Sequence, residues 1–288
     1  KPPKRIITVV TGSRAEFGLL ESVLRAIAGH RQLTLKTVVT GTHLTTGTWR
    51  DLPAAGFVID TKVPMQKRGC IGRDADVAAL GRGVVGLGKT FSAIKPDVIL
   101  VLGDRIEVMA AATAGSVGGF RVAHMHGGDR AEGVADEAIR HAVSKLAHLH
   151  FPATATSAKR LLRMGENPDC IFNVGSPAMD CLAEVQPLPG GPKVIVLQHP
   201  IGASDKQEGL WFRQTYRAAA ALKQPMCVLK PNGDPGSGGI VAAQKSVGHI
   251  VAHVPRFRFL AMLAGAVCIV GNSSAGLIEA AGLKTATV

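Results

Sequence analysis

The stretch from residue 97 to residue 147 constrains the fold more than any other part of the sequence. Two short apolar runs, at residues 98–102 and 121–126, flank an alanine-rich helical pattern at residues 106–116. A buried strand, a helix and a second strand in this order form a βαβ unit. Each run ends in glycine and charged residues, and open α/β sheets bind their ligands at the carboxyl ends of their strands. The stretch therefore predicts a parallel sheet with a ligand site at those ends.

A helical pattern closes this stretch and adds further charges. Residues 134–147 carry apolar side chains at helical spacing, with Asp136 and Glu137 in the first turn and Lys145 near the last. These charges have the signs that a helix dipole favours at each end. Taken singly, each charged residue is equally well explained as part of a solvated loop. Their convergence at consecutive strand and helix ends favours a functional site.

The rest of the chain repeats the alternation of strands and helices. Before the central stretch, strands are predicted at residues 5–11, 35–40 and 57–63, and helices at 16–28 and 74–94. After it, strands are predicted at 148–151 and 171–174, and helices at 156–164 and 178–185. A Pro/Gly cluster at 187–192 indicates a domain boundary. Beyond it, strands are predicted at 193–197, 226–229, 249–253 and 267–270, and helices at 208–222, 256–263 and 276–281.

Two sets of βα units joined by one linker predict an α/β protein of two doubly wound, Rossmann-like lobes that face a cleft. The predicted lobes are residues 1–186 and 187–288, and 288 residues suit two domains of ~150 residues each. The second lobe ends at Val288 directly after a predicted strand, so we expect the chain to be incomplete at that end.

Composition narrows the classes of function. The sequence has no apolar run of the ~18–20 residues that a membrane span needs and no signal peptide. Its five cysteines are scattered without CxxC spacing, which favours reduced thiols in a cytoplasm over disulfides or a zinc site. The net charge of +12 suits an anionic ligand. Basic residues are dispersed and only 4% of residues are aromatic, so a phosphorylated small molecule fits better than nucleic acid.

A set of short motifs, in order along the chain, resembles one enzyme family. The motifs are GSRAEF at 12–17, LGDR at 102–105, HMHGGDRAEG at 124–133, DEAIRHAVSKLAHLHF at 136–151, VGSPAMD at 174–180, QHP at 198–200 and VGNSSAGLIEA at 270–280. Together they resemble the UDP-N-acetylglucosamine 2-epimerases, most closely the hydrolysing branch of the sialic-acid pathway. The resemblance implies a glycosyltransferase-B-like fold and conversion of UDP-GlcNAc and water to UDP and N-acetylmannosamine. It also implies no metal or other cofactor and a homodimer or homotetramer.

The resemblance assigns roles to residues of both lobes. The first lobe would carry the catalytic acids Asp104, Asp136 and Glu137, and the second would bind the UDP moiety. Arg14 would neutralise the departing diphosphate, the backbone amides at Ser273 and Ser274 would hold it, Glu279 would bind the ribose, and His199 matches a family histidine. Asn272 to Ser274 are also explained as a helix cap, and His199 as a structural histidine. Further predicted substrate contacts are Arg105, Asp129, Arg140, Asn272 and Gly276, where Arg140 either steers Asp136 or forms a surface pair with it.

The sequence departs from the family at one position of the predicted site. Several relatives have glutamate in an H-x-E-G-G motif where this chain has His126. A neutral imidazole is a competent base near pH 7, so His126 is one candidate for the proton-transfer group. Asp129 and Glu132 are the alternatives.

Four other functions compete with hydrolytic epimerisation. One is the non-hydrolysing epimerase that interconverts UDP-GlcNAc and UDP-ManNAc, and another is a relative acting on a diacetamido nucleotide sugar. A glycosyltransferase of the same fold is disfavoured because no acceptor-binding or membrane-facing region is apparent. The last is a nucleotide-sugar binding module that has lost catalysis, which the departure at His126 would explain.

Overall fold

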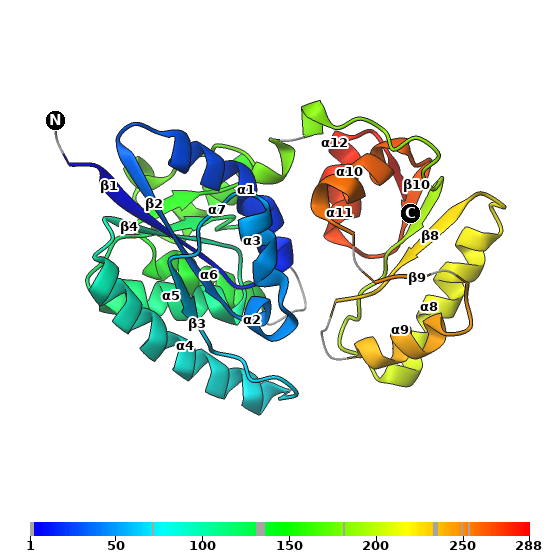
Figure 1. Cartoon of the computed structure of the whole chain (residues 1–288), viewed down its shortest axis with the longest axis horizontal. Helices are drawn as coiled ribbons and strands as arrows, with labels where there is room; N and C mark the ends of the chain where they lie inside the picture. Colours follow the sequence, from blue (N-terminus) through cyan, green and yellow to red (C-terminus); the bar gives the residue numbers. More distant parts are fainter. Residues whose placement is uncertain are drawn as a thin grey trace. The chain divides into compact units, whose positions relative to one another are not determined.

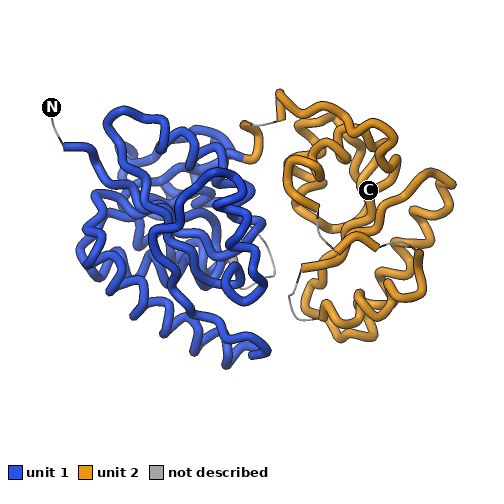
Figure 2. Tube along the Cα trace, in the orientation of Figure 1, with its two compact units in different colours: residues 1–177 blue, residues 178–288 orange. Residues whose placement is uncertain are grey.

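The computed structural model describes residues 3–70, 72–130, 136–180, 182–232, 236–248, 250–252 and 254–288, with only the backbone for Asp136 and Ala183. The chain divides into two compact units, Lys1–Pro177 and Ala178–Val288 (Figure 2). Each unit is a parallel sheet with helices on its faces (Figure 1), so the α/β fold class is confirmed.

The described part of the first unit contains a six-stranded parallel sheet in the order β3-β2-β1-β4-β5-β6. Its strands are β1 (Arg5–Thr11), β2 (Leu33–Thr40), β3 (Thr61–Val63), β4 (Val98–Leu102), β5 (Val122–Met125) and β6 (Leu149–Phe151). Because the chain winds in opposite directions from β1, the switch point of the sheet lies between β1 and β4. The loops that follow these two strands and β5 carry the first-lobe residues of the predicted site.

Apolar residues on both faces of each central strand explain why this sheet lies between two layers of helices. Val9 and Val10 of β1 are both buried but belong to different core clusters. One face packs against α1 (Arg14–Gly29), whose Phe17, Leu20 and Leu24 form its buried stripe. The other packs against α4 (Arg73–Ile94) and α5 (Ile106–Val117). The remaining helices are α2 (Thr42–Thr46), α3 (Asp51–Ala54), α6 (Asp136–Leu146) and α7 (Ala155–Arg163), with 3-10 turns at Thr48–Arg50 and Pro168–Cys170.

Within the described ranges, the second unit has a five-stranded parallel sheet in the order β11-β10-β7-β8-β9. The strands are β7 (Val194–Val196), β8 (Met226–Leu229), β9 (Ile250–Val251), β10 (Cys268–Val270) and β11 (Ala286–Thr287). Its helices are α8 (Asp205–Ala220), α9 (Ser237–Gln244), α10 (Arg256–Gly265), α11 (Ser274–Leu277) and α12 (Glu279–Gly282). The chain winds outward in both directions from β7 and β10, so the loops after these two strands meet at the switch point.

Some predicted elements differ from the structure. The strand predicted at 171–174 is reduced to a single bridge between His150 and Ile171, and the side chains of Phe172 and Val174 remain exposed. The helix predicted at 178–185 is replaced by two 3-10 turns, Pro177–Met179 and Leu182–Glu184. Those turns pack with the second unit, where Leu182 joins a core cluster with Leu260. The compact units therefore divide before the Pro/Gly cluster at 187–192 rather than within it.

Three further observations bear on the classes of function considered above. Among the helices that the structure describes, none is both long and apolar enough to cross a membrane. Cys70, Cys170, Cys227 and Cys268 are free thiols, while Cys181 lies outside the described residues. Burial raises the pKa of the Cys227 thiol. In the described part of the chain, no group of three or more His, Cys, Asp or Glu side chains is arranged to hold a metal ion.

Candidate active site

The loop after β4 places Asp104 beside an arginine of α6. Gly103 has a φ of 90°, a conformation that glycine adopts without strain, and it turns the chain out of the strand. Asp104 then forms an ion pair with Arg140, and both side chains are mostly buried, at 17% and 13% exposure. Burial lowers the pKa of Arg140, which nevertheless remains a permanent cation. Arg140 thus contacts Asp104. The side chain of Asp136, which was its predicted partner, lies outside the described residues.

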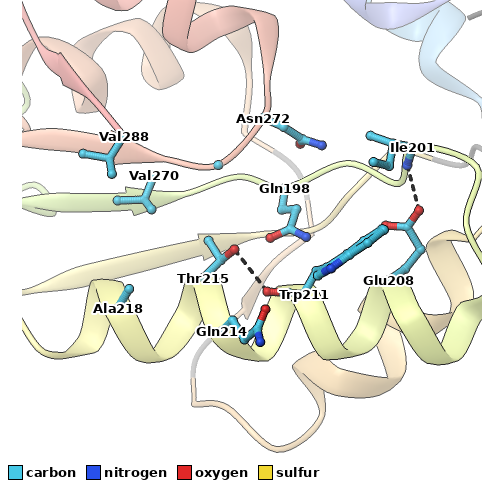
Figure 3. Close-up of a pocket in the computed structure, with 11 residues that line it drawn as sticks. Gln198, Ile201, Glu208, Trp211, Gln214, Thr215, Ala218, Val270, Asn272 and Val288 are labelled. Atoms are coloured by element: carbon cyan, nitrogen blue, oxygen red, sulfur yellow. Dashed lines mark hydrogen bonds between the residues drawn. The ribbon is translucent and has the colours of Figure 1, made fainter. Parts of the chain in front are cut away.

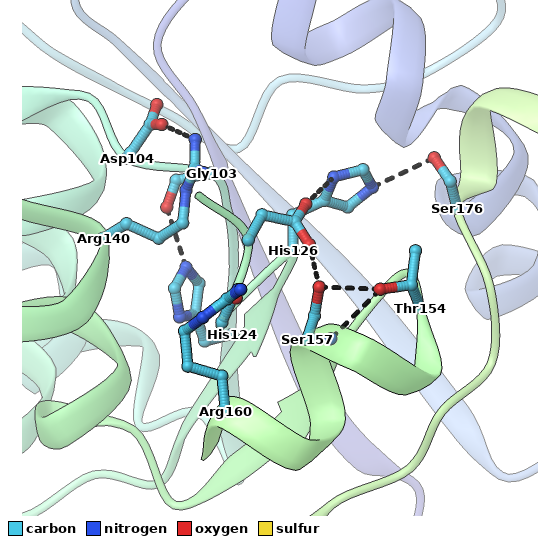
Figure 4. A network of polar contacts seen from close by, with 11 residues as sticks. Gly103, Asp104, His124, His126, Arg140, Thr154, Ser157, Arg160 and Ser176 are labelled. Carbon is cyan, nitrogen blue, oxygen red and sulfur yellow. Dashed lines mark hydrogen bonds and ion pairs between the residues drawn. The ribbon is translucent and has the colours of Figure 1, made fainter. Parts of the chain in front are cut away.

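A buried histidine fixes this loop against α6 (Figure 4). His124 of β5 has its Nε2 2.7 Å from the carbonyl oxygen of Gly103 and its Nδ1 3.1 Å from Ser144 Oγ. Burial lowers the pKa of His124 to about 4, so the ring is neutral at pH 7. Because a carbonyl only accepts, Nε2 carries the proton, and the unprotonated Nδ1 faces the Ser144 hydroxyl. His124 is therefore a positioning residue that joins the ends of β4 and β5 to α6.

The loop after β5 places two polar side chains, His126 and Asp129, in a row with two serines from elsewhere in the first unit. His126 Nδ1 lies 3.3 Å from Asp129 Oδ2, and His126 Nε2 lies 3.0 Å from Ser176 Oγ. The second carboxylate oxygen of Asp129 accepts a hydrogen bond of 2.5 Å from Ser157 Oγ. In Figure 4, His126 comes from the loop after β5, Ser157 from α7 and Ser176 from the segment before Pro177.

The backbone of His126 is strained. Its φ is 61°, and the other non-glycine residues with positive φ in the described part are lysines at helix ends: Lys95, Lys223 and Lys284. A left-handed conformation costs an ordinary residue ~1–2 kcal/mol, and such strain is concentrated at functional sites. The next residue, Gly127, is also constrained, because a Cβ there would lie 2.9 Å from both His124 Nδ1 and Ser144 Oγ. The loop thus presents the His126 imidazole at an energetic cost.

Asp129 is held as a carboxylate. Burial alone would raise its pKa, but hydrogen bonds from His126 and Ser157, together with the charges of His126 and Arg160, lower it below its usual value. Arg160 also donates to the carbonyl of Gly128, which fixes the loop to α7. Asp129 therefore supplies a permanent negative charge behind the imidazole of His126.

The structure also describes the side chains of Glu137, Arg105 and Arg14. Glu137 is within 3.5 Å of Arg130 Nε and 3.6 Å of His141 Nε2, at 25% exposure. Arg105 lies 3.5 Å from the buried Glu107 carboxylate. Arg14 is exposed at the start of α1. Glu132 lies outside the described residues.

A second carboxyl group lies buried at the switch point beneath the loop after β1. Glu16 accepts a 2.8 Å hydrogen bond from the Gly12 amide, and a Cβ on Gly12 would lie 2.5 Å from Glu107 Cγ. Burial raises the pKa of Glu16 to about 8, and the charge of Glu107 adds to the increase against the opposing Gly12 hydrogen bond. Glu16 is therefore mostly protonated at pH 7. Glu16 was not predicted as a site residue, although the GSRAEF motif contains it.

Replacement of Glu16 by glutamine is expected to make stability less sensitive to alkaline pH. The carboxyl has a pKa of 4.5 when unfolded and about 8 when folded, so the folded state binds more protons between these values and wild-type stability falls as pH rises. Glutamine keeps the acceptor for Gly12 and never ionises. As pH rises between these two pKa values, the free energy of unfolding of the variant should increase relative to that of wild type by up to ~1.4 kcal/mol per pH unit. Urea unfolding across pH 5–9 measures this difference. Glu21→Gln is the control, because Glu21 is partly exposed on the same helix, where it pairs with Arg25. Parallel pH curves for Glu16→Gln and wild type would refute the assignment.

In the second unit, His199 lies where the loops after β7, β8 and β10 meet. The Asn272 side chain accepts from the His199 amide at 2.7 Å and donates to the His199 carbonyl at 2.8 Å. The amide of Asn232 donates to His199 Nδ1 at 3.0 Å. Because Nδ1 is an acceptor here, the proton of the neutral ring is on Nε2, which makes His199 a hydrogen-bond donor held at a fixed position.

The residues predicted to hold a nucleotide follow β10. Gly271 has a φ of 139°, and a Cβ there would lie 2.1 Å from the carbonyl of Leu197, so the two loops can approach only with glycine at this position. Ser273 caps α11 and accepts from the Ala275 amide at 3.4 Å. Gly276 is buried in α11. Glu279 is buried and receives a 2.9 Å hydrogen bond from Arg256 Nη1. Both predicted interpretations of Asn272 to Ser274, capping and ligand binding, remain compatible with this geometry.

A cavity of about 520 Å³ lies beside these loops on the second unit (Figure 3). One side of α8 contributes Trp211, Gln214, Thr215 and Ala218, and the opposite wall includes Gln198, Val270 and Asn272. Of the candidate site side chains, Asn272 lines it, whereas His199, Ser273 and Glu279 do not. The cavity therefore shares Asn272 with the predicted nucleotide contacts and is otherwise lined by other residues.

Three residues of the first-unit network were not predicted from the sequence. His124, Ser157 and Ser176 all lie within hydrogen-bond distance of site atoms. Ser176 belongs to the VGSPAMD motif and His124 to the HMHGGD motif, so motif membership was the available signal for both. Ser157 has no such signal, because only the fold brings α7 to Asp129.

The fold defines a class of two-unit, doubly wound proteins, and solved structures match it over nearly the whole chain. The crystal structure of UDP-GlcNAc 2-epimerase from Neisseria meningitidis bound to UDP-GlcNAc has a TM-score of 0.83 at 19% identity, over 99% of this chain and 82% of that one. The enzyme from Methanocaldococcus jannaschii in complex with UDP-GlcNAc and UDP gives 0.82 at 19% identity, over 98% and 83%. Both support a glycosyltransferase-B-like fold.

Sequence comparison then gives the family. A family model described as UDP-N-acetylglucosamine 2-epimerase matches residues 25–288. The UDP-N,N'-diacetylbacillosamine 2-epimerase (hydrolyzing) of Legionella pneumophila is 34% identical over 96% of this chain and 78% of its own length. The UDP-N-acetylglucosamine 2-epimerase of Neisseria meningitidis serogroup B is 32% identical over 96% and 77%. The chain belongs to the UDP-N-acetylglucosamine 2-epimerase family.

Proposed function

We propose that this chain is a hydrolysing UDP-N-acetylglucosamine 2-epimerase that converts UDP-GlcNAc and water to N-acetylmannosamine and UDP. The observation that carries the proposal is the pair of groups at adjacent strand ends: Asp104 held by Arg140 after β4, and His126 held by Asp129 after β5. A carboxylate and an imidazole at neighbouring strand ends provide electrostatic stabilisation and proton transfer. The Legionella relative, named as hydrolyzing, supports the same branch.

The reaction begins with departure of UDP from C1, because the C2 hydrogen is barely acidic until positive charge develops on the sugar. Asp104 stabilises that oxocarbenium character as a nearby carboxylate. Arg14 and the backbone amides at Ser273 and Ser274 neutralise the leaving diphosphate, as family resemblance implies, and Glu279 binds the ribose. The second unit thus binds the UDP moiety in this proposal.

Loss of the C2 proton then gives a 2-acetamidoglucal. His126 is the base in this proposal, because a neutral imidazole accepts a proton near pH 7, whereas the contacts of its competitor Asp129 hold the pKa of that carboxyl below its usual value. Water adds at C1 while a proton is returned to C2 from the opposite face, and Asp136 and Glu137 are the family-matched acids for that step. His199, with its proton on Nε2, donates a hydrogen bond to the UDP-sugar.

A second candidate substrate is a diacetamido nucleotide sugar. Two relatives bear names of this kind, from Legionella pneumophila and, at 25% identity, Campylobacter jejuni. The non-hydrolysing reaction is the other alternative, since the Neisseria relative's name does not specify hydrolysis. A cytoplasmic location, inferred from the scattered cysteines, and a homodimer or homotetramer stay predictions.

Proton NMR of the full-length protein in deuterated water tests the proposal directly. With UDP-GlcNAc we expect UDP and free N-acetylmannosamine that carries deuterium at C2. UDP-ManNAc in equilibrium with the substrate would instead indicate the non-hydrolysing reaction. Turnover only of a UDP-diacetamido sugar would move the proposal to that substrate, and UDP binding without any turnover would indicate a binding module.

A further inference from the structure

Both ring nitrogens of His126 are occupied, which limits how this residue can act. Nδ1 faces Asp129 Oδ2 at 3.3 Å, and Nε2 faces Ser176 Oγ at 3.0 Å. Only 12% of the His126 side chain is exposed. A base needs an accessible lone pair, and the only lone pair of a neutral imidazole lies on its unprotonated nitrogen. Whichever group exchanges a proton with His126 therefore does so at one of these two contacts.

Asp129 determines which nitrogen carries the proton. Its carboxylate accepts hydrogen bonds only, and its lowered pKa keeps it ionised, so Nδ1 of His126 is the donor toward it. Nε2 then accepts the hydroxyl proton of Ser176. The same order of groups, a carboxylate orienting an imidazole that accepts from a hydroxyl, activates the hydroxyl oxygen in enzymes of several folds.

The chain around Ser176 fixes the position of this hydroxyl. Gly175 has a φ of 84°, so it turns the backbone in a way that favours glycine. Pro177 follows and begins the 3-10 turn Pro177–Met179. A proline also restricts the residue before it to extended conformations. Ser176 thus lies between two backbone constraints, and its hydroxyl meets His126 from a segment fifty positions away in sequence.

We propose that Ser176 is a catalytic residue through which His126 exchanges a proton with the sugar; this rests on the function proposed above. As the C1–O bond to UDP breaks and its electron pair leaves with UDP, the C2–H bond breaks and its electron pair forms the C1–C2 double bond. The C2 proton passes to Ser176 Oγ while the hydroxyl proton of Ser176 passes to His126 Nε2. The products are the 2-acetamidoglucal, UDP and an imidazolium paired with the Asp129 carboxylate.

Ser176→Ala tests the proposal by kinetics and by isotope effect. The alanine variant loses the proton relay from the sugar through Ser176 to His126. Such a relay contributes to the rate as a general base does, so kcat should fall about 100-fold. Because only proton transfer is impaired, the deuterium isotope effect on kcat with C2-deuterated substrate should rise above that of wild type. Ser176→Thr, which keeps a hydroxyl, should retain more activity than the alanine variant. Ser92→Ala is the matched control, since Ser92 is exposed on α4 and its hydroxyl bonds only its own helix, at Gly88.

The outcomes separate this inference from the proposed function. If wild type turns over the substrate and Ser176→Ala has the same kcat and isotope effect, the relay is overturned and the epimerase proposal stays intact. A fall in kcat with an unchanged isotope effect would also overturn it, because a purely structural role slows all steps alike. Absence of turnover by wild type on UDP-GlcNAc and on a diacetamido nucleotide sugar would overturn both. A lower kcat with a larger isotope effect supports the relay.

Discussion

Asp104→Asn should lower kcat by about 10²–10³-fold, the loss seen when one preorganised charge-stabilising group is removed from an active site. Asparagine has nearly the same shape but no charge, so it cannot stabilise a developing oxocarbenium ion. KM for the UDP-sugar should change little, because the charge appears only in the transition state. Steady-state release of UDP measures both constants.

The same replacement also leaves Arg140 without its ionic partner. Hydrogen bonds to charged groups contribute about 1.5–3 kcal/mol, so part of that stability is lost and the assay must run well below the melting temperature. Asp60→Asn is the matched control, because Asp60 forms an ion pair with Lys36 in the same unit but outside the candidate site. Near-normal turnover by Asp104→Asn would show that Asp104 has a structural role only.

His126→Asn should abolish most activity while the fold persists. Asparagine tolerates a left-handed backbone better than most residues, so it suits the φ of 61° at this position. It retains hydrogen-bonding capacity toward Asp129 or Ser176 but has no group that titrates near pH 7. Loss of a general base predicts a decrease in kcat of about 10²–10⁴-fold.

Circular dichroism and thermal unfolding would establish that the His126→Asn variant is folded. His30→Asn, at an exposed histidine that follows α1, is the control for the same chemical change and should leave kcat unaltered. If the His126→Asn variant turns over substrate within a few-fold of wild type, His126 is not the base, and Glu132 becomes the leading alternative.

Much of the fold was predictable because burial patterns are local. The run at residues 98–102 and the helix that follows it begin in the structure where the sequence placed them, at Val98 and Ile106. Prediction failed where packing or pairing depended on distant segments. Residues 237–244 form α9, yet two glycines in its first turn conceal the helical pattern, and its stability comes from packing on α8 at Gly209.

The candidate site was predictable as a location but not as a network. Charges after two apolar runs pointed to the ends of β4 and β5, and parallel strands necessarily bring such ends together. The partner of each charge was not predictable. Arg140 was expected to steer Asp136 or to form a surface pair with it, and its contact with Asp104 on a different segment carried no signal in the sequence. Ser176 contacts His126 only because the chain returns to the sheet after α7.

The left-handed backbone of His126 has a consequence for protein engineering. A glycine there would release strain worth ~1–2 kcal/mol. It would also remove the contacts that the imidazole makes with Asp129 and Ser176. Because a hydrogen bond to a charged group contributes about 1.5–3 kcal/mol, this loss offsets the released strain. Thermostabilising campaigns on this family member should therefore hold residue 126 fixed and seek their gains at sites distant from the loop after β5.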